Sequence, residues 1–332
     1  MEAFIKAISY YLPERVLTNQ DLVDEFPEWT VEKIAGKIGI IERHIAAENE
    51  TAGDMAISAA EKLFYEHDID RSQIDFVILC TQSPDYFLPS TACVVQHRLG
   101  LKTTCGAFDI NLGCSGYEYA LATAKGLIIG GISRNVLVLT AETYSKHIHP
   151  NDKGNRTIFG DGASATVVSS AGFARILDFT LGTDGFGFDA LIQRTGGWRN
   201  RCQIGDLRFT EDGVPVSSDF LYMDGKRIFD FSSDVVPKLV EDNLRINGLQ
   251  LSEINLFVFH QANKYMINYL RKLLQIEIDR FFICLEKVGN TVSSTIPIAL
   301  VEAGKQGLLH GRIMLVGFGV GLSYGATVLI AE

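Results

Sequence analysis

The stretch Ala107-Phe108-Asp109-Ile110-Asn111-Leu112-Gly113-Cys114-Ser115-Gly116 decides how the rest of the chain is interpreted. It predicts a short buried strand, a tight glycine turn and a cysteine at the start of a helix that continues to residue 129 without a proline. A thiol in the first turn of a helix meets unpaired main-chain N–H groups and the positive end of the helix dipole. Both favour the thiolate, the nucleophilic form of cysteine. The alternative is an inert buried thiol, and position alone does not decide between the two.

Strands and helices alternate on both sides of this unit. Buried strands are predicted at 4–10, 75–80, 136–140, 255–259 and 312–316, and helices at 19–26, 30–37, 54–66, 90–98, 228–247, 263–274 and 295–309. Pro237 predicts a kink or a break in the long helix 228–247. The alternation indicates an α/β protein with a parallel or mostly parallel sheet.

The second half of the chain repeats the plan of the first. Each half closes on a glycine turn and a short apolar strand, at 160–168 and at 323–330. The repeat suggests an internal duplication, with an N-terminal half at 1–172 and a C-terminal half at 173–332. The irregular segment 183–224 is too long for a plain connection, and we expect it to form a lid or a channel wall.

Composition narrows the class of protein. Apolar residues make up 47% and charged residues 21% of the 332 residues, as in a globular protein with a substantial core. The net charge of -10 argues against a general nucleic-acid binder. No apolar run approaches the length of a transmembrane helix, and the N-terminus lacks a signal-peptide pattern, so we expect no membrane insertion. Six cysteines without CxxC spacing indicate reduced thiols of a cytoplasmic protein rather than a disulfide frame or a zinc site.

Two further stretches can carry chemistry. In His260-Gln261-Ala262-Asn263 an imidazole leaves the carboxyl end of a buried strand, where function is common in such sheets. The stretch Gly289-Asn290-Thr291-Val292-Ser293-Ser294-Thr295 is polar, and its alternative interpretation is a turn with a helix cap. Each signal is weak alone, but their matching places in a duplicated fold favour a shared site.

Three other patterns are weaker. Trp29 near Lys33 and Lys37 suits a flat aromatic ligand such as adenine, although simple packing is the alternative. His147 and His149 have no third metal ligand nearby, so an exposed loop is the better interpretation and no metal site is predicted. The glycines at 317–321 precede another strand rather than a helix, which excludes a dinucleotide loop.

The motifs taken together resemble one family over nearly the whole chain. They are Glu42-Arg43-His44-Ile45-Ala46, Asn111-Leu112-Gly113-Cys114-Ser115-Gly116, Phe159-Gly160-Asp161-Gly162-Ala163, His260-Gln261-Ala262-Asn263, Gly289-Asn290-Thr291 and Gly319-Val320-Gly321-Leu322-Ser323-Tyr324-Gly325. In this order and spacing they resemble the β-ketoacyl-acyl carrier protein synthase III family of thiolase-like condensing enzymes. The resemblance implies two fused βαβαβαββ halves in a five-layered α-β-α-β-α core, a homodimer, and a coenzyme A thioester as substrate with no permanently bound cofactor.

The resemblance also implies a reaction and a catalytic triad of Cys114, His260 and Asn290. The reaction is a decarboxylating Claisen condensation of an acyl-CoA with malonyl-acyl carrier protein through an acyl-Cys114 intermediate, in fatty acid or related lipid or polyketide biosynthesis. The main-chain N–H groups of Cys114 and Val320 would hold the oxyanion. His260 and Asn290 would donate hydrogen bonds to the malonyl thioester carbonyl and so stabilise the enolate.

Ligand contacts follow from the same resemblance. Residues placed on coenzyme A are Trp29 at the adenine, Lys33 (or Lys37) and Lys153 at the phosphates, and Asn263 at the pantetheine arm. Leu88 replaces a larger aromatic residue with which the dimer partner closes the acyl pocket, and this implies a longer or bulkier acyl group than acetyl. Tyr265 stands where the family has a carrier-docking arginine, and Lys264, Arg271 and Lys272 could replace that charge. Val320 stands in place of a glycine.

Two alternatives remain open at this point. An acyltransferase on the same scaffold would pass the acyl group from Cys114 to an alcohol or amine without forming a C–C bond. A non-catalytic scaffold subunit is the more remote alternative. The sequence leaves open the acyl chain length, the acceptor and the pathway.

Overall fold

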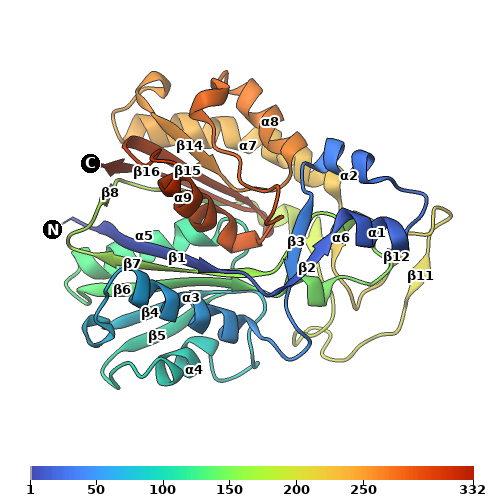
Figure 1. Ribbon diagram of the computed structural model, residues 1–332, viewed down its shortest axis with the longest axis horizontal. Coiled ribbons are helices and arrows are strands. Elements are labelled where there is room, and N and C mark those ends of the chain that lie inside the picture. Colours follow the sequence, from blue (N-terminus) through green and yellow to red (C-terminus); the bar gives the residue numbers. More distant parts are fainter. Residues whose placement is uncertain (1) are drawn as a thin grey trace.

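The structure is a computed structural model and describes residues 2–332 (Figure 1). Its helices are α1 (Asn19–Glu25), α2 (Val31–Ile38), α3 (Ala52–Glu66), α4 (Thr91–Arg98), α5 (Gly116–Ile129), α6 (Lys153–Arg156), α7 (Gly225–Ile246), α8 (Lys264–Leu273) and α9 (Thr295–Lys305). Its strands are β1 (Phe4–Tyr11), β2 (Arg15–Thr18), β3 (Glu42–Ile45), β4 (Phe76–Cys80), β5 (Gly106–Ile110), β6 (Asn135–Glu142), β7 (Gly162–Ser169), β8 (Ala174–Ile176), β9 (Thr180–Thr183), β10 (Leu191–Ile192), β11 (Arg208–Phe209), β12 (Pro215–Val216), β13 (Tyr222–Met223), β14 (Leu256–Phe259), β15 (Gly311–Gly319) and β16 (Ser323–Ala331). Short 3-10 turns lie at η1 (Arg71–Gln73), η2 (Tyr144–His147), η3 (Gly185–Gly187), η4 (Leu251–Glu253), η5 (Ile278–Arg280) and η6 (Val292–Ser294).

Five layers build the molecule (Figure 1). Helices α3 and α4 cover one face of the strands β5-β4-β6-β7-β1, and α7 lies on strands β15 and β16 with α8 packed beside it. Helices α5 and α9 lie between the two strand sets, since α5 packs against β4 and β6 on one side and β15 and β16 on the other. This is the α-β-α-β-α order expected from the sequence.

The sheet itself differs from the expectation of a mostly parallel one. Strands β14 and β15 pair in parallel, as do β4 with β5 and β4 with β6. The middle of the sheet is antiparallel, because β1 pairs with β7 and β8, and β16 pairs with β15, β8 and β9. Strand β1 thus joins the strands of both halves into one hydrogen-bonded set in the order β14-β15-β16-β8-β1-β7-β6-β4-β5.

The apolar core follows the layers. Leu121 of α5 and Leu300 of α9 are fully or almost fully buried in one cluster with Val138 of β6 and Val258 of β14. These central strands are continuous apolar runs because helices cover both of their faces. The helices are fixed at their ends by polar caps; Thr51, for example, accepts a hydrogen bond from Asp54 N at the start of α3. The central layer therefore holds the start of α5 rigidly against the C-terminal strands.

Two local expectations change. Helix α7 runs without a break through Pro237, so the predicted break is wrong. The segment 183–224 is mainly loop with short strands, and residues 191–193 and 195–197 with residue 221 line a cavity, in keeping with the expected channel wall.

Within the described residues, no helix is long and apolar enough to cross a membrane.

Candidate active site

Cys114 lies in the turn between β5 and α5. Helix α5 begins at Gly116 with Ser115 as its cap residue, so the cysteine precedes the first helical turn by two residues rather than lying within it. Ser115 Oγ lies 2.6 Å from Ser323 Oγ, and Ser323 Oγ donates to the Val320 carbonyl at 3.0 Å. This chain of hydroxyls ties the cysteine turn to the hairpin between β15 and β16.

The sulfur of Cys114 is buried and is a thiol at rest. Burial raises the pKa of Cys114 to about 12, and the main-chain N–H groups of Val320 and of Cys114 itself, which donate to the sulfur, offset this only in part. The N–H groups favour the thiolate, as the sequence indicated, but desolvation outweighs them and keeps the pKa raised. The structure does bring the sulfur and both predicted oxyanion donors together.

Strand β15 approaches the cysteine more closely than a side chain would permit. A Cβ on Gly319 would lie 2.7 Å from Cys114 Cβ and 2.8 Å from its sulfur. A Cβ on Gly113 would lie 2.5 Å from Val320 Cγ1 and 3.2 Å from Val292 Cγ1. The two glycines thus allow the C-terminal half to close over the sulfur.

Asn290 and His260 are both held by one residue, Val292. Asn290 Oδ1 accepts the Val292 N–H at 2.9 Å, which leaves the amide N–H groups of Asn290 to donate elsewhere. The Val292 carbonyl accepts a hydrogen bond from Thr295 Oγ1 at 3.1 Å, and Thr295 Oγ1 lies 2.8 Å from Nδ1 of the His260 ring. Because Val292 also borders Gly113, the three predicted triad residues converge on one turn.

The imidazole of His260 is neutral. Burial lowers the pKa of His260 to about 3, because the charged ring would lose its hydration, while the Val292 carbonyl opposes that shift. The ring packs edge-on against Phe318 of β15, with the ring centres 5.8 Å apart. A neutral ring can accept or donate a hydrogen bond at its free nitrogen, according to its tautomer, without bringing a charge into the site.

Glu142 lies at the end of β6 beside this turn, and the sequence reasoning missed it. It accepts the Gln82 N–H at 3.1 Å with each carboxyl oxygen and the hydroxyls of Ser83 and Ser293 at 3.2 and 3.3 Å. Burial raises its pKa to about 8 despite these donors. An acidic residue three positions after the apolar run 136–139 was the signal that could have revealed it.

A cavity of about 470 Å³ leads away from Val320. Tyr144, Leu191 and Leu221 line it together with Phe87 and other residues of the two neighbouring loops. The cavity ends at Val320, one of the two predicted oxyanion donors, and its lining mixes apolar side chains with polar ones such as Gln82, Asn111 and Gln193. A cavity of this kind beside the candidate nucleophile suits an acyl chain.

His147 also lines this cavity, which corrects its interpretation as an exposed loop residue. Its Nδ1 lies 2.6 Å from Gln193 Oε1 and its Nε2 lies 3.2 Å from Ser83 Oγ, and burial lowers its pKa. Leu88 does not line the cavity of its own chain and is 76% exposed. Its predicted contact concerns a second copy of the chain and stays a prediction.

The residues predicted to bind coenzyme A lie near one another in pairs. Lys33 Nζ lies 5.9 Å from the centre of the half-buried Trp29 ring. Lys153 forms an ion pair with Glu28 and lies over Phe26 at 5.5 Å, so its charge is partly compensated. Asn263 caps α8 by accepting Met266 N–H at 2.9 Å, which leaves its amide N–H groups available.

The three basic residues predicted to dock the carrier protein all belong to α8. Lys264 and Lys272 are exposed, and Lys264 packs its stem against Gly39. Arg271 is half-buried and donates to the Ile276 carbonyl at 2.7 Å, so part of its donor capacity is already used. The exposed Tyr265 stacks on Phe229 with ring centres 5.8 Å apart.

Comparisons with known proteins agree with this arrangement. Residues 108–185 match the family model described as 3-oxoacyl-[acyl-carrier-protein (ACP)] synthase III, and residues 244–330 match the model of its C-terminal part. The β-ketoacyl-[acyl-carrier-protein] synthase III of Clostridium acetobutylicum is 36% identical over 325 residues, which cover 96% of this chain and 95% of that protein.

Solved structures extend the likeness to the fold. A crystal structure of a 3-oxoacyl-(acyl-carrier-protein) synthase III superposes with a TM-score of 0.97 and 46% identity, covering 100% of both chains. The enzyme of that name from Pseudomonas aeruginosa PAO1 superposes with a TM-score of 0.88 and 31% identity over 100% of this chain and 99% of its own. The predicted thiolase-like fold is confirmed.

Proposed function

The chain belongs to the 3-oxoacyl-[acyl-carrier-protein] synthase III family, and from that premise we propose that it condenses an acyl-CoA with malonyl-acyl carrier protein and releases CO₂. The pair of neutral hydrogen-bond donors, His260 and Asn290, carries this proposal. A negatively charged enolate is stabilised by neutral donors and would be repelled by a carboxylate in their place.

Acylation is the first half-reaction. The thiol of Cys114 loses its proton to the neutral ring of His260 as its sulfur attacks the thioester carbon, and the proton then passes to the departing coenzyme A thiolate. The carbonyl oxygen takes over the N–H groups of Cys114 and Val320, which donate to the sulfur at rest. The raised pKa of Cys114 keeps the thiol protonated until a thioester arrives.

Decarboxylation and C–C bond formation are the second half-reaction. The malonyl thioester carbonyl accepts hydrogen bonds from the amide N–H of Asn290 and from Nε2–H of His260, which is then in the tautomer whose Nδ1 accepts from the Thr295 hydroxyl. Loss of CO₂ leaves its electron pair in the enolate, which attacks the acyl carbon on Cys114. The new C–C bond forms as the C–S bond breaks, and the thiolate of Cys114 takes up a proton from water.

The surrounding residues bind the two substrates. The acyl group occupies the 470 Å³ cavity beside Val320, which is large enough for chains beyond acetyl. Trp29, Lys33, Lys153 and Asn263 hold the coenzyme A, and the basic residues of α8 meet the acidic carrier protein. No permanently bound cofactor enters this scheme. Six unpaired cysteines agree with a reducing compartment such as the cytoplasm.

The test separates the two half-reactions. Intact mass after incubation with a panel of acyl-CoA thioesters reports acylation of Cys114, and labelled CO₂ from malonyl-acyl carrier protein reports condensation. We expect Cys114→Ala to abolish acylation. Asn290→Ala should keep acylation and lower CO₂ release by about 10²–10³-fold, the effect of removing one such donor.

Asn49→Ala, an exposed change, is the matched control and should leave both signals unchanged. Acylation without CO₂ release above background in the unmodified protein would contradict the proposal. That outcome would favour transfer of the acyl group to an alcohol or amine.

A further inference from the structure

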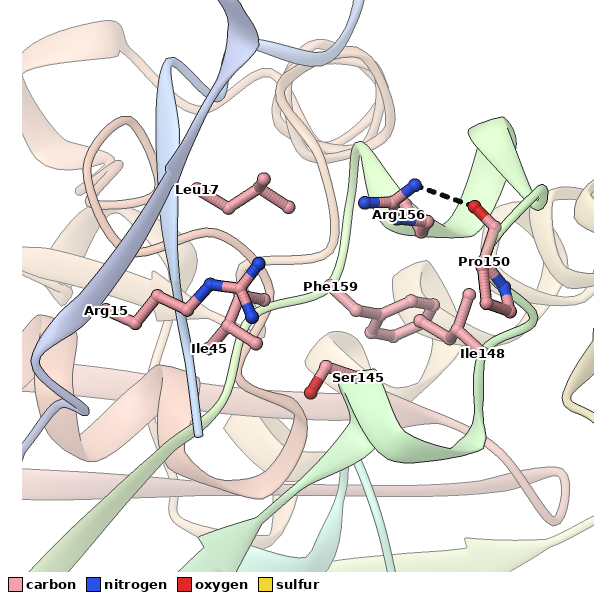
Figure 2. A pocket seen from close by; sticks show the side chains of 8 residues that line it. All are labelled: Arg15, Leu17, Ile45, Ser145, Ile148, Pro150, Arg156 and Phe159. Atoms are coloured by element: carbon pink, nitrogen blue, oxygen red, sulfur yellow. Dashed lines mark hydrogen bonds between the residues drawn. The ribbon is translucent and has the colours of Figure 1, made fainter. Parts of the chain in front are cut away.

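A second, smaller cavity of about 180 Å³ lies outside the candidate active site (Figure 2). It is formed by β2, β3 and the segment 145–159, and its lining residues are Arg15, Leu17, Ile45, Ser145, Ile148, Pro150, Arg156 and Phe159. At about 30 Å³ per water, it has room for roughly six waters or a few carbon atoms. Nothing in the proposed reaction uses it.

The floor of this cavity is apolar. Leu17, Ile148 and Phe159 are each less than 10% exposed, and Ile45 and Pro150 complete the wall. Ser145 is the one hydroxyl among the lining residues, and it already donates to Asp161 Oδ2 at 2.5 Å. The floor therefore offers no spare donor for a ligand that needs polar contacts on every side.

One guanidinium group at the cavity is unpaired. Arg15 reaches from β2 toward the floor (Figure 2), and within residues 2–332 it has neither an ion pair nor a side-chain hydrogen bond. Two acids whose pKa the charge of Arg15 lowers are engaged with other groups. Glu25 pairs with Arg156 at 2.5 Å, and Asp21 accepts from the Thr18 N–H and hydroxyl at 2.8 and 2.7 Å.

Positive charge accumulates around this cavity although the chain is acidic overall. Arg43 is fully buried behind Leu17, donates to the Leu17 and Thr157 carbonyls and to Asn19, and has no carboxylate within ion-pair distance in the described chain. Its Nε has no partner. Burial, with a smaller contribution from nearby Arg156, lowers the pKa of Arg43 to about 10. Two arginines, Arg15 and Arg156, line the cavity, and of the two only Arg156 has an ion pair, with Glu25.

We propose that this cavity binds a small carboxylate with a short aliphatic tail, with the carboxylate on Arg15 and the tail on the floor of Leu17, Ile148 and Phe159. A guanidinium group matches a carboxylate in a planar, two-pronged pair. A phosphate would need donors for all of its oxygens, and the floor has none to give. The aliphatic tail of the ligand would displace water from the apolar floor of the cavity, and this favours binding.

The site borders the candidate active site through Phe159. The Phe159 ring packs against Tyr144 of the acyl cavity with ring centres 5.2 Å apart. Its main chain forms a β-bridge with Asn290, and the flanking Gly160 N–H donates to the Asn290 carbonyl at 3.0 Å. A ligand on the floor therefore rests on the segment that positions Asn290.

The test is a binding titration of the whole chain, monitored by NMR of carbon-13 labelled butyrate with no thioester present. We expect saturable binding that is roughly tenfold tighter than that of acetate, because two additional methylenes are buried. Arg15→Gln should weaken butyrate binding at least tenfold, and Arg15→Glu should abolish it. Arg134→Gln, at another exposed arginine, is the matched control and should bind like the unmodified protein.

Three results would overturn the inference. They are no saturable butyrate binding, equal binding by the Arg15→Gln variant, and inorganic phosphate binding as tightly as butyrate. Because Arg15 is exposed, both variants should keep the melting temperature of the unmodified protein. The titration needs no catalysis, so its outcome is independent of the condensation proposed above.

Discussion

Val292 positions two side chains of the candidate site, Asn290 and His260. Its φ of 55° is a left-handed conformation that β-branched side chains rarely adopt and that costs of order 1–3 kcal/mol. Its N–H orients Asn290, and its carbonyl accepts a hydrogen bond from Thr295 Oγ1, which contacts Nδ1 of His260. The surrounding core overrides the local preference, since Val292 is fully buried. A strained backbone here fixes two donors with one turn.

The thiol of Cys114 should respond to pH as a buried acid. Its pKa is raised to about 12, so the thiolate is scarce at neutral pH and its fraction grows about tenfold per pH unit. We predict that iodoacetamide alkylates Cys114 at a rate that rises through pH 7–9.5 without a plateau. Peptide mapping by mass follows this cysteine separately from the exposed Cys202, the internal control for reagent. A plateau below pH 9 would contradict the prediction.

Glu118 is a buried carboxyl with no partner for either oxygen among the described residues. It lies in α5 against Gly317 and Gly325, which face each other across β15 and β16. Burial raises its pKa well above the usual value. The native state therefore holds a proton that the unfolded chain releases above about pH 4.5, and this stabilising contribution is lost as pH rises.

Glu118→Gln keeps the shape of the protonated acid but cannot ionise. We predict that the variant gains stability relative to the unmodified protein as pH rises from 5 to 9, measured by urea unfolding. Glu211→Gln, in an exposed loop, should leave the pH profile of stability unchanged. Parallel profiles for Glu118→Gln and the unmodified protein would exclude this role.

At the scale of elements, two glycines lie in opposite environments. Gly319 of β15 has no room for a Cβ beside Cys114, whereas a Cβ on Gly126 of α5 would meet no atom within 4 Å. We predict that Gly319→Ala costs about 1–3 kcal/mol of stability through overpacking and slows acylation of Cys114. Gly126→Ala should instead stabilise α5 by roughly 0.5–1 kcal/mol.

Chemical denaturation and intact-mass kinetics measure both variants side by side. Acylation by the Gly126→Ala variant should equal that of the unmodified protein. A Gly319→Ala protein with unchanged stability and acylation would show that β15 can move away from the cysteine at no cost.

The sequence predicted elements whose signals are local. Helix α3 carries its caps and apolar face within 15 residues, and β4 is a continuous apolar run. Pairing direction is not local: β1 meets β7 and β8, which lie about 150 residues further along the chain. The antiparallel centre of the sheet could not be read from the pattern of β1 alone. The predicted break at Pro237 was wrong for a related reason. Packing of α7 on β15 and β16 overrides the helix-breaking preference of proline.

The residues of the candidate site also fall into two groups: those with a signal in their own stretch of sequence, and those whose environment depends on distant segments. Cys114 and His260 each follow a predicted strand, and the resemblance of their motifs and of Gly289-Asn290-Thr291 to one family implied that the three residues act together. His147 and Glu142 were missed because their burial depends on loops distant in sequence, at Gln193 and at Gln82. The sequence left the state of Cys114 open, because a helix start is visible in sequence whereas desolvation depends on how β15 closes over the sulfur.

The whole molecule carries an exposed apolar cluster, composed of Tyr86, Phe87, Leu88 and Trp198, each at least 60% exposed. Phe87 packs edge-on against Trp198 with ring centres 5.5 Å apart. The cluster lies near β5, an edge strand of the sheet that has no partner on its outer side in the described chain. Exposed apolar clusters and open sheet edges mark association surfaces. We propose that two copies of the chain meet here, and that the duplication has its boundary at Gly172.

Leu88→Asp tests this proposal. We predict that light scattering finds a dimer for the unmodified protein and a monomer for the variant at micromolar concentration, because a carboxylate cannot be buried without a partner. Acylation of Cys114 should fall with the loss of the dimer. Ile132→Asp, at a residue 70% exposed outside the cluster, should remain dimeric. A monomeric unmodified protein would remove the basis for the proposal.

The loop that carries Leu88 makes the activity of one subunit depend on the other subunit of the dimer. If each copy completes its neighbour's cavity, two impaired variants can complement one another in a mixed dimer. The subunit without the nucleophile supplies an intact loop, and the subunit with the altered loop supplies an intact Cys114. Co-expression of Cys114→Ala with an uncharged loop variant, Leu88→Ala, would then give more turnover than either chain alone, whereas Leu88→Asp, which we expect to stay monomeric, would not complement.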